Sequence, residues 1–252
     1  MSAGTISVIL RKRLLVRPLA KLASSGTIAL AALSASSAHA YCRTTVCQNA
    51  SGICENGATG CKTIPGTVCT PAQPTDCGKP LFWRGLCVGY SVQRDASSAV
   101  TLDQTEKAIA WALDMWTKAP CEGGVPSIKT QYMGPVECRK HEYNPTGPNA
   151  NVILFREDVW PCNGSMDTLA LTTVTYNVRT GEIYDADMEL NSVGTQFSFG
   201  DTDVGFDFLS IVTHELGHFL GLGHSADTNA VMWPYYMLGD IRFRNLTVSR
   251  AT

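Results

Sequence analysis

The 252-residue sequence has no strong excess of charge of either sign. It contains 20 basic and 22 acidic residues, which give a formal net charge of -2. Nothing in this balance indicates a nucleic-acid or membrane-surface partner, so we expect neither. Long apolar runs are also missing: no stretch approaches the roughly 20 residues that a membrane-spanning helix needs. We therefore expect no membrane span in the mature chain.

The chain contains 10 cysteines but no Cys-x-x-Cys pair. Cysteine zinc sites usually need such closely spaced pairs, so their absence disfavours a site of that kind. An even number of cysteines in an exported chain instead predicts disulfide bonds, although spacing does not reveal their connectivity. All ten follow Tyr41, at positions 42, 47, 54, 61, 69, 77, 87, 121, 138 and 162.

The first 40 residues contain no acidic side chain and resemble an export signal. Five basic residues between Arg11 and Lys21 precede a short apolar run at 27–33, and Ala38-His39-Ala40 is a small-x-small cleavage signal. We predict a signal peptide at 1–40 and a secreted, extracellular protein. A membrane anchor is the alternative, but the apolar run is too short to span a bilayer.

Residues 41–80 differ in composition from the rest of the chain. They hold six cysteines and many Gly, Pro, Thr and Asn residues, with few large apolar side chains. Such a segment cannot build a core and would depend on disulfide bridges for its shape. Its six cysteines could pair among themselves, which would leave Cys87, Cys121, Cys138 and Cys162 for two bridges in the remaining domain, 81–252.

The pattern from residue 81 onward predicts one globular domain of strands and helices. A helix is expected at 102–119, with Thr101 or Asp103 as its cap, and a second at 207–220. Strands followed by a helix predict an α+β or α/β domain with a mixed sheet. The expected strands are 86–93, 127–133, 152–155, 169–177 and 182–190, the last two forming a hairpin.

Three of the five histidines lie between positions 214 and 224. On a helix, His214 and His218 are one turn apart on the same face, so their imidazoles can bind one metal ion. Zinc suits this arrangement because it accepts neutral imidazole nitrogens and tolerates three protein ligands plus water. Glu215 is adjacent to the first ligand and is the expected general base for the water.

His224 lies six residues beyond His218, where a continued helix would turn it away from the metal. Gly221 and Gly223 are expected to end the helix and return His224 to the ion, because glycine adopts positive φ easily. The alternative is three unrelated histidines, but their joint spacing with Glu215 makes chance a poor explanation.

The stretch from His214 to His224 resembles the zinc-binding consensus of the metzincin metallopeptidases. Met232, eight residues after His224, resembles the methionine turn beneath the metal. Ser225 and Pro234 resemble the matrixin branch, and we expect a secreted matrixin of the bacterial type. The strands at 152–155 and 181–185 also resemble those that precede the matrixin site.

The resemblance implies an α+β, metzincin-like catalytic domain with a mixed, mostly parallel five-stranded sheet and an active-site helix, preceded by the disulfide-rich segment. Substrate would lie antiparallel to an edge strand, for which 182–190 or its neighbour is the candidate. Residues 234–236 would form one wall of the pocket for the substrate side chain that follows the scissile bond.

Two departures from the family accompany this resemblance. Many relatives hold a second, structural zinc with three further histidines; here only His141 is available, so we expect that site to be absent. Matrixin domains usually close with a helix after the methionine turn, but only 18 residues follow Pro234. The domain is therefore expected to be truncated or to have a short closing helix.

Two clusters of acidic residues indicate calcium as a candidate structural cofactor in addition to zinc. Asp185, Asp187 and Glu189 alternate along one strand, and a second group occupies the loop at 201–207. Calcium takes such oxygen ligands. The alternative is a solvated strand edge and an ordinary polar loop. The second group consists of Asp201, Asp203 and Asp207.

The sequence thus predicts a secreted, monomeric zinc metalloendopeptidase that acts on protein or peptide substrates. One alternative is a secreted, disulfide-rich binding protein on a degenerate metallopeptidase scaffold, and another is a metal-dependent deacylase. The intact Glu215 favours an enzyme, because a scaffold needs no general base, whereas the short C-terminus favours the binding protein.

Overall fold

The computed structural model describes residues 3–13, 45–46, 79–120, 124–160, 167–225 and 227–246. Most of the predicted cysteine-rich segment lies outside these ranges, as do Cys121 and Cys162. Cys87 and Cys138 are free thiols in the structure. The predicted disulfide bonds therefore stay predictions.

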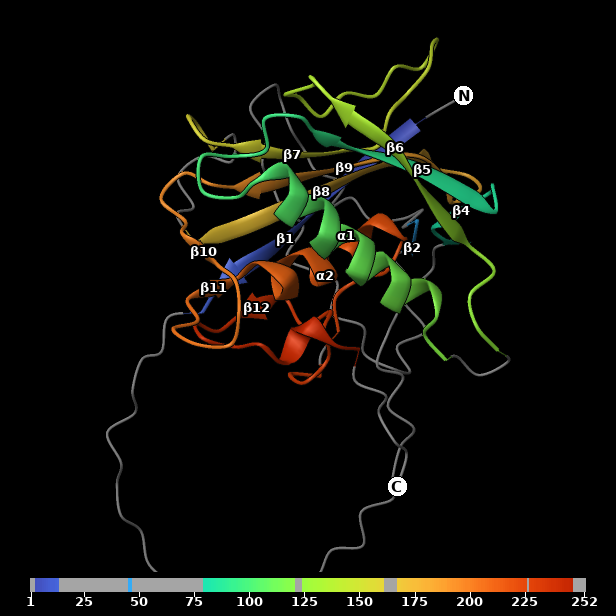
Figure 1. Ribbon diagram of the computed structural model, residues 1–252. Coiled ribbons are helices and arrows are strands. Elements are labelled where there is room, and N and C mark those ends of the chain that lie inside the picture. The colour runs from blue at the N-terminus through green and yellow to red at the C-terminus, as the bar shows by residue number, and fades with distance from the viewer. Residues whose placement is uncertain are drawn as a thin grey trace, which may run out of the picture.

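The described chain forms one eight-stranded sheet with two helices packed on the same face (Figure 1). Five of its strands run in the order β6-β5-β7-β9-β8; all are parallel except β8, which is antiparallel to β9. The prediction of an α+β fold with a mixed, mostly parallel five-stranded sheet is thereby confirmed. These strands are β5 (Cys87–Gln93), β6 (Lys129–Val136), β7 (Val152–Arg156), β8 (Thr168–Asn177) and β9 (Glu182–Asn191).

Two short strands extend this sheet. β4 (Phe82–Trp83) pairs with β9, and β12 (Tyr235–Tyr236) lies at one end of the sheet order. Two further two-residue pairs join β2 (Thr45–Val46) to β3 (Lys79–Pro80), and β10 (Phe197–Ser198) to β11 (Phe206–Asp207).

Helix α1 (Leu102–Thr117) begins where the sequence predicts. Thr101 caps it: its hydroxyl accepts from the Gln104 backbone N–H at 3.2 Å, and the Gln104 side chain accepts from the Thr101 N–H at 3.0 Å. Near its other end, the Trp116 indole donates 2.8 Å to the carbonyl of Thr213 in α2 (Phe208–Phe219). This bond ties the two helices together beneath the sheet.

The hairpin of β8 and β9 follows the predicted strands, with Gly181 at φ 83° in the turn. β9 lies between β8 and β7, so it is the neighbour of the edge of the five-stranded set rather than the edge itself. β8 forms that edge. No helix in the described part of the chain is long and apolar enough to cross a membrane.

An additional strand, β1 (Ala3–Lys12), pairs antiparallel with β8 and parallel with β12. These residues fall within the range predicted as a signal peptide, where no strand was expected. The pairing does not test export, which stays a prediction. The consequence for the fold is that β1 fills the sheet between β8 and β12.

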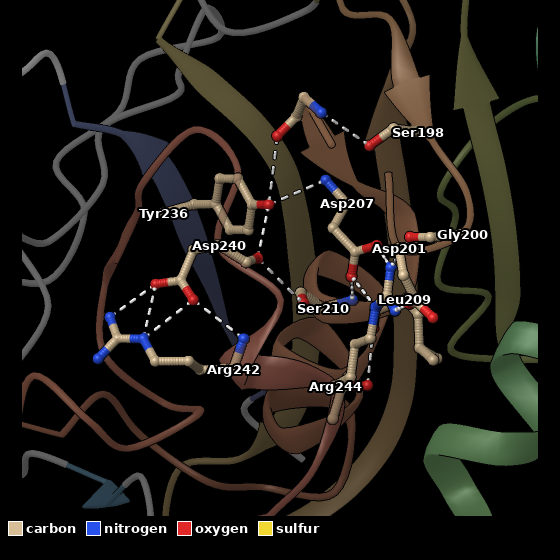
Figure 2. Close-up of polar contacts among 12 residues, drawn as sticks. Ser198, Gly200, Asp201, Asp207, Leu209, Ser210, Tyr236, Asp240, Arg242 and Arg244 are labelled. Atoms are coloured by element: carbon tan, nitrogen blue, oxygen red, sulfur yellow. Dashed lines mark hydrogen bonds and ion pairs between the residues drawn. The ribbon is translucent and has the colours of Figure 1, made fainter. Parts of the chain in front are cut away.

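The C-terminal segment ends in a single 3-10 turn, η1 (Arg242–Arg244), within the described residues. Figure 2 shows how it is held: the Arg244 guanidinium donates to both carboxylate oxygens of Asp207, at 2.9 and 2.6 Å, and also binds Asp201. The Tyr236 hydroxyl accepts from the Asp207 N–H at 3.0 Å and donates to the Asp240 carbonyl at 2.7 Å. The short end is thus fastened to the start of α2.

Candidate metal centre

Helix α2 carries the predicted motif through the centre of the molecule. Asp207 caps it by accepting from the Ser210 N–H at 2.9 Å. Every residue of the helix except Leu209 is buried, although nearly half of its residues are polar. His214, Glu215 and His218 are likewise buried, so these three polar side chains lie in a low-dielectric environment.

The helix ends in a Schellman motif that redirects the chain toward His224. Gly221 has φ 92°, its N–H bonds to the His218 carbonyl at 2.9 Å, and the Leu222 N–H bonds to the Gly217 carbonyl at 2.9 Å. The predicted role of Gly221 is therefore confirmed. Gly223 does not adopt positive φ, so one glycine suffices for the turn.

The three histidine rings converge as the motif predicts. The Nε2 atom of His218 lies 3.0 Å from Nε2 of His214 and 3.2 Å from Nε2 of His224. Each of the first two rings is fixed through its other nitrogen: His214 Nδ1 lies 2.6 Å from the Val231 carbonyl, and His218 Nδ1 lies 2.7 Å from the Leu222 carbonyl. Because a carbonyl only accepts, these Nδ1 atoms carry the protons and leave Nε2 with a free lone pair.

This arrangement fits a cation. The Nε2 lone pairs of His214 and His218 lie 3.0 Å apart and repel unless a positive charge lies between them. Burial lowers the pKa of His214 to about 4 and that of His224 to about 3, and lowers the pKa of His218 well below its usual value. The rings are therefore neutral at pH 7, the state in which imidazole binds zinc. Among the described residues this is the one cluster of three metal-ligating side chains.

Glu215 lies between α2 and the strands above it. The Thr172 hydroxyl of β8 donates 2.5 Å to Glu215 Oε2, and the backbone N–H of Leu10 in β1 also interacts with this carboxylate. Burial raises the pKa of Glu215 to about 8, while the two donors oppose that shift. A nearby divalent cation would, like the two donors, favour the ionised form of Glu215. The contact of Thr172 with Glu215 was not predicted, because the only local signal was the Thr-rich composition of 169–177.

Met232 lies in a tight turn that contacts α2. The Trp233 N–H bonds to the Ala230 carbonyl at 3.0 Å, and the Ser225 N–H bonds to the Met232 carbonyl at 2.8 Å. The side chain of Met232 is fully buried and packs against α2 at Gly217. The turn therefore supports the helix between two of the histidines.

The acidic strand residues are not a solvated edge. Asp185, Asp187 and Glu189 are all buried in β9, so that alternative is wrong. Asp187 accepts from the backbone N–H groups of Val152 and Glu142, at 2.7 and 3.0 Å, which satisfies its charge without solvent. These loop and strand contacts are long-range and were not predictable from alternation alone.

Glu189 and the acidic loop also have protein partners. Glu189 pairs with Arg156 and lies 2.8 Å from His141 Nδ1, so His141 is part of this cluster. In the loop, Asp201 and Asp207 bind Arg244. Calcium binding stays a prediction, because the described residues contain no cluster of metal ligands other than the three histidines.

Comparison with known proteins adds an independent line of argument. A family model described as Matrixin matches residues 82–249. Human matrilysin is 42% identical over 83 residues, which cover 33% of this chain and 28% of that protein. Human matrix metalloproteinase-20 is 33% identical over 164 residues (63% and 28%), and matrix metalloproteinase-C of Caenorhabditis elegans is 27% identical over 178 residues (68% and 27%). The chain spans less than a third of the length of these relatives.

Proposed function

Because the chain belongs to the matrixin family of zinc metallopeptidases, we propose that it is a secreted zinc endopeptidase that hydrolyses protein or peptide substrates. The observation that carries this proposal is the convergence of three neutral, buried imidazoles beside a buried carboxylate. Family membership supports the enzyme class and zinc as the metal. Secretion rests on the predicted signal peptide.

His214, His218 and His224 would hold the zinc through their Nε2 atoms. The carbonyls of Val231 and Leu222 fix two of the rings and keep their protons on Nδ1. Zinc bound there supplies a Lewis acid that polarises a substrate carbonyl and lowers the pKa of water.

Glu215 would act as general base and then as general acid. Its carboxylate takes a proton from the attacking water and delivers it to the departing amine nitrogen of the substrate. The Thr172 hydroxyl holds one carboxylate oxygen at 2.5 Å and so fixes the orientation of the other. Burial excludes competing water from this proton transfer.

The competing proposal, a binding protein on a degenerate scaffold, drew support from the short C-terminus. The ion pairs of Arg244 with Asp207 and Asp201 provide an anchor for that end, which weakens the reason. A binding protein would also have no use for a buried carboxylate beside the three imidazoles.

The test is proteolysis by the full chain, refolded in vitro with zinc under conditions that form disulfides. Casein cleavage should disappear with a chelator and return with added zinc. The Glu215→Ala variant should bind zinc equally and cleave more slowly by roughly 10² to 10⁴ or more. A zinc-loaded, folded chain that leaves casein and gelatin intact would contradict the proposal.

A further inference from the structure

Strand β1 is hydrogen-bonded on both sides as it crosses the candidate site. It runs antiparallel to β8 from Ala3 opposite Asn177 to Leu10 opposite Ala170, and its register then shifts. From Arg11 onward it also runs parallel to β12, with bonds from Arg11 N–H to the Pro234 carbonyl at 3.2 Å and from Arg13 N–H to the Tyr236 carbonyl at 2.9 Å. Figure 1 shows β1, in blue, lying between β8 and β12.

The residues at this register shift lie over the reactive groups. The Leu10 backbone N–H interacts with the Glu215 carboxylate, and Arg11 lies near His224. The Leu10 side chain is fully buried within the core, whereas Arg11 is exposed. An extended peptide thus passes the metal centre with the Leu10 side chain inserted into the main core, while the adjacent Ile9 is buried against Leu171.

The contact with Glu215 identifies a particular peptide bond. The nitrogen of Leu10 belongs to the Ile9–Leu10 bond and would become the departing amine if that bond were hydrolysed. In the proposed mechanism Glu215 delivers its proton to such a nitrogen. The chain is therefore placed with its own backbone in the position of a substrate.

We infer that Ala3–Lys12 is a substrate segment of this protein, held along β8 and β12 for hydrolysis of its Ile9–Leu10 bond. The inference rests on the proposed function. Water is the only co-reactant: its hydroxyl adds to the Ile9 carbonyl carbon, the C–N bond breaks, and the Leu10 nitrogen leaves with the proton. The products are a carboxylate at Ile9 and a new amino terminus at Leu10.

While it is uncut, the segment also blocks the site. Its hydrogen bonds use the edge of β8 and the edge of β12, which another extended peptide would need. The uncut chain should therefore cleave other proteins slowly. Removal of the predicted signal peptide after Ala40 would free the same groove by breaking a different bond, and mass spectrometry separates the two new termini.

The first experiment uses the full chain, refolded in vitro so that residues 1–40 are present, and adds zinc. Intact-mass analysis should find a new terminus at Leu10 in the parent chain and none in Glu215→Ala. Leu10→Asp, which would bury a charge, should also remain uncut at this bond. Thr5→Asp introduces the same charge at an exposed position of the same strand and should be cut like the parent.

Casein hydrolysis is measured in the same samples. Casein cleavage with an intact Ile9–Leu10 bond would overturn the inference and leave the proposed function standing. A zinc-loaded chain that cuts neither contradicts the proposed function itself.

The second experiment reads binding instead of activity and uses zinc-loaded, inactive Glu215→Ala chains. A fluorescent peptide of residues 3–12 competes with the attached copy of the same segment, which has a high effective concentration. Adding Leu10→Asp to this background should free the groove and tighten peptide binding at least tenfold, while Thr5→Asp should leave it unchanged. Equal affinity in both, or no binding to either, would overturn the inference. If circular dichroism shows that Leu10→Asp does not fold, the parent chain is instead given the free peptide of residues 3–12. Cleavage of that peptide between Ile and Leu supports the inference, and an uncut peptide overturns it.

Discussion

The thioether of Met232 packs against helix α2 at Gly217, in space that a side-chain Cβ at that position would need. Glycine inside a helix is normally less stable than alanine by about 0.5–1 kcal/mol. Gly217 therefore serves the contact with the methionine turn rather than the helix. Since His218 is the next residue, the contact also helps to position that proposed ligand.

Gly217→Ala should destabilise the protein by about 1–3 kcal/mol despite its better helix propensity, because the new methyl group overlaps Met232 and approaches Trp116. Chemical denaturation measures the loss, and zinc content is expected to fall with it. Adding Met232→Ala should recover part of the loss relative to Met232→Ala alone. A Gly217→Ala variant that is more stable than the parent would rule out the steric role.

His224→Ala should weaken zinc binding and proteolysis together, since it removes one of three proposed ligands rather than a proton carrier. Metal analysis of the purified, folded variant makes the measurement. His141→Ala is the matched control, because His141 contacts Glu189 and lies outside the triad; it should retain one zinc per chain. Unchanged zinc affinity in His224→Ala would show that this histidine is not a ligand.

The parts of the site that could be predicted from sequence are those set by local geometry. His214 and His218 meet because an i, i+4 spacing places them on one helix face, and Gly221 turns the chain because it alone adopts the left-handed conformation there. The hairpin of β8 and β9 likewise follows from a Thr-Gly turn between two strand patterns. None of these requires knowledge of distant contacts.

The parts that could not be predicted depend on long-range pairing. Thr172 reaches Glu215 across 43 positions, and nothing local to either residue encodes that bond. The pairing of residues 3–12 with β8 was missed because their basic, acid-free neighbourhood indicates an export signal. The acidic residues of β9 looked exposed by their alternation, whereas backbone donors from another segment allow Asp187 to be buried.

Arg244→Met should lower stability by about 3 kcal/mol, because it leaves the buried Asp207 carboxylate without its cationic partner at the start of α2. Arg242→Met is the control: that arginine pairs with Asp240 at a half-exposed position, where ion pairs contribute about 0–1 kcal/mol. Urea denaturation compares the two. Equal, small effects would mean that the C-terminal segment is held in some other way.

Asp185 and Asp187 form a buried acidic pair on β9. Burial, together with repulsion from the neighbouring Asp187, raises the pKa of Asp185 to about 8; burial also raises the pKa of Asp187 to about 6. These carboxyls share a face of β9 and titrate as a pair. A carboxyl whose pKa is higher in the folded than in the unfolded state holds its proton more tightly when folded, so stability should fall as pH rises from about 4 to 8.

His141 changes stability in the same direction. Its hydrogen bond to Glu189 raises its pKa, so its contribution is present at low pH and is lost as pH rises through the folded-state value. Asp185→Asn isolates the carboxyl pair from this effect. The variant should lose less stability than the parent between pH 5 and pH 9, and it should be the more stable of the two at pH 9.

Urea midpoints at pH 5, 7 and 9, with zinc present and calcium absent, make the measurement, and exposed Asp158→Asn should follow the parent at every pH. Adding calcium to the same samples tests whether these acidic residues of β9 bind that ion. A bound cation would favour the ionised carboxyls, so added calcium would stabilise the parent at pH 9 and leave Asp185→Asn unchanged. If Asp185→Asn falls in stability as steeply as the parent without calcium, Asp185 does not hold its proton at neutral pH, and its burial must be compensated by another group.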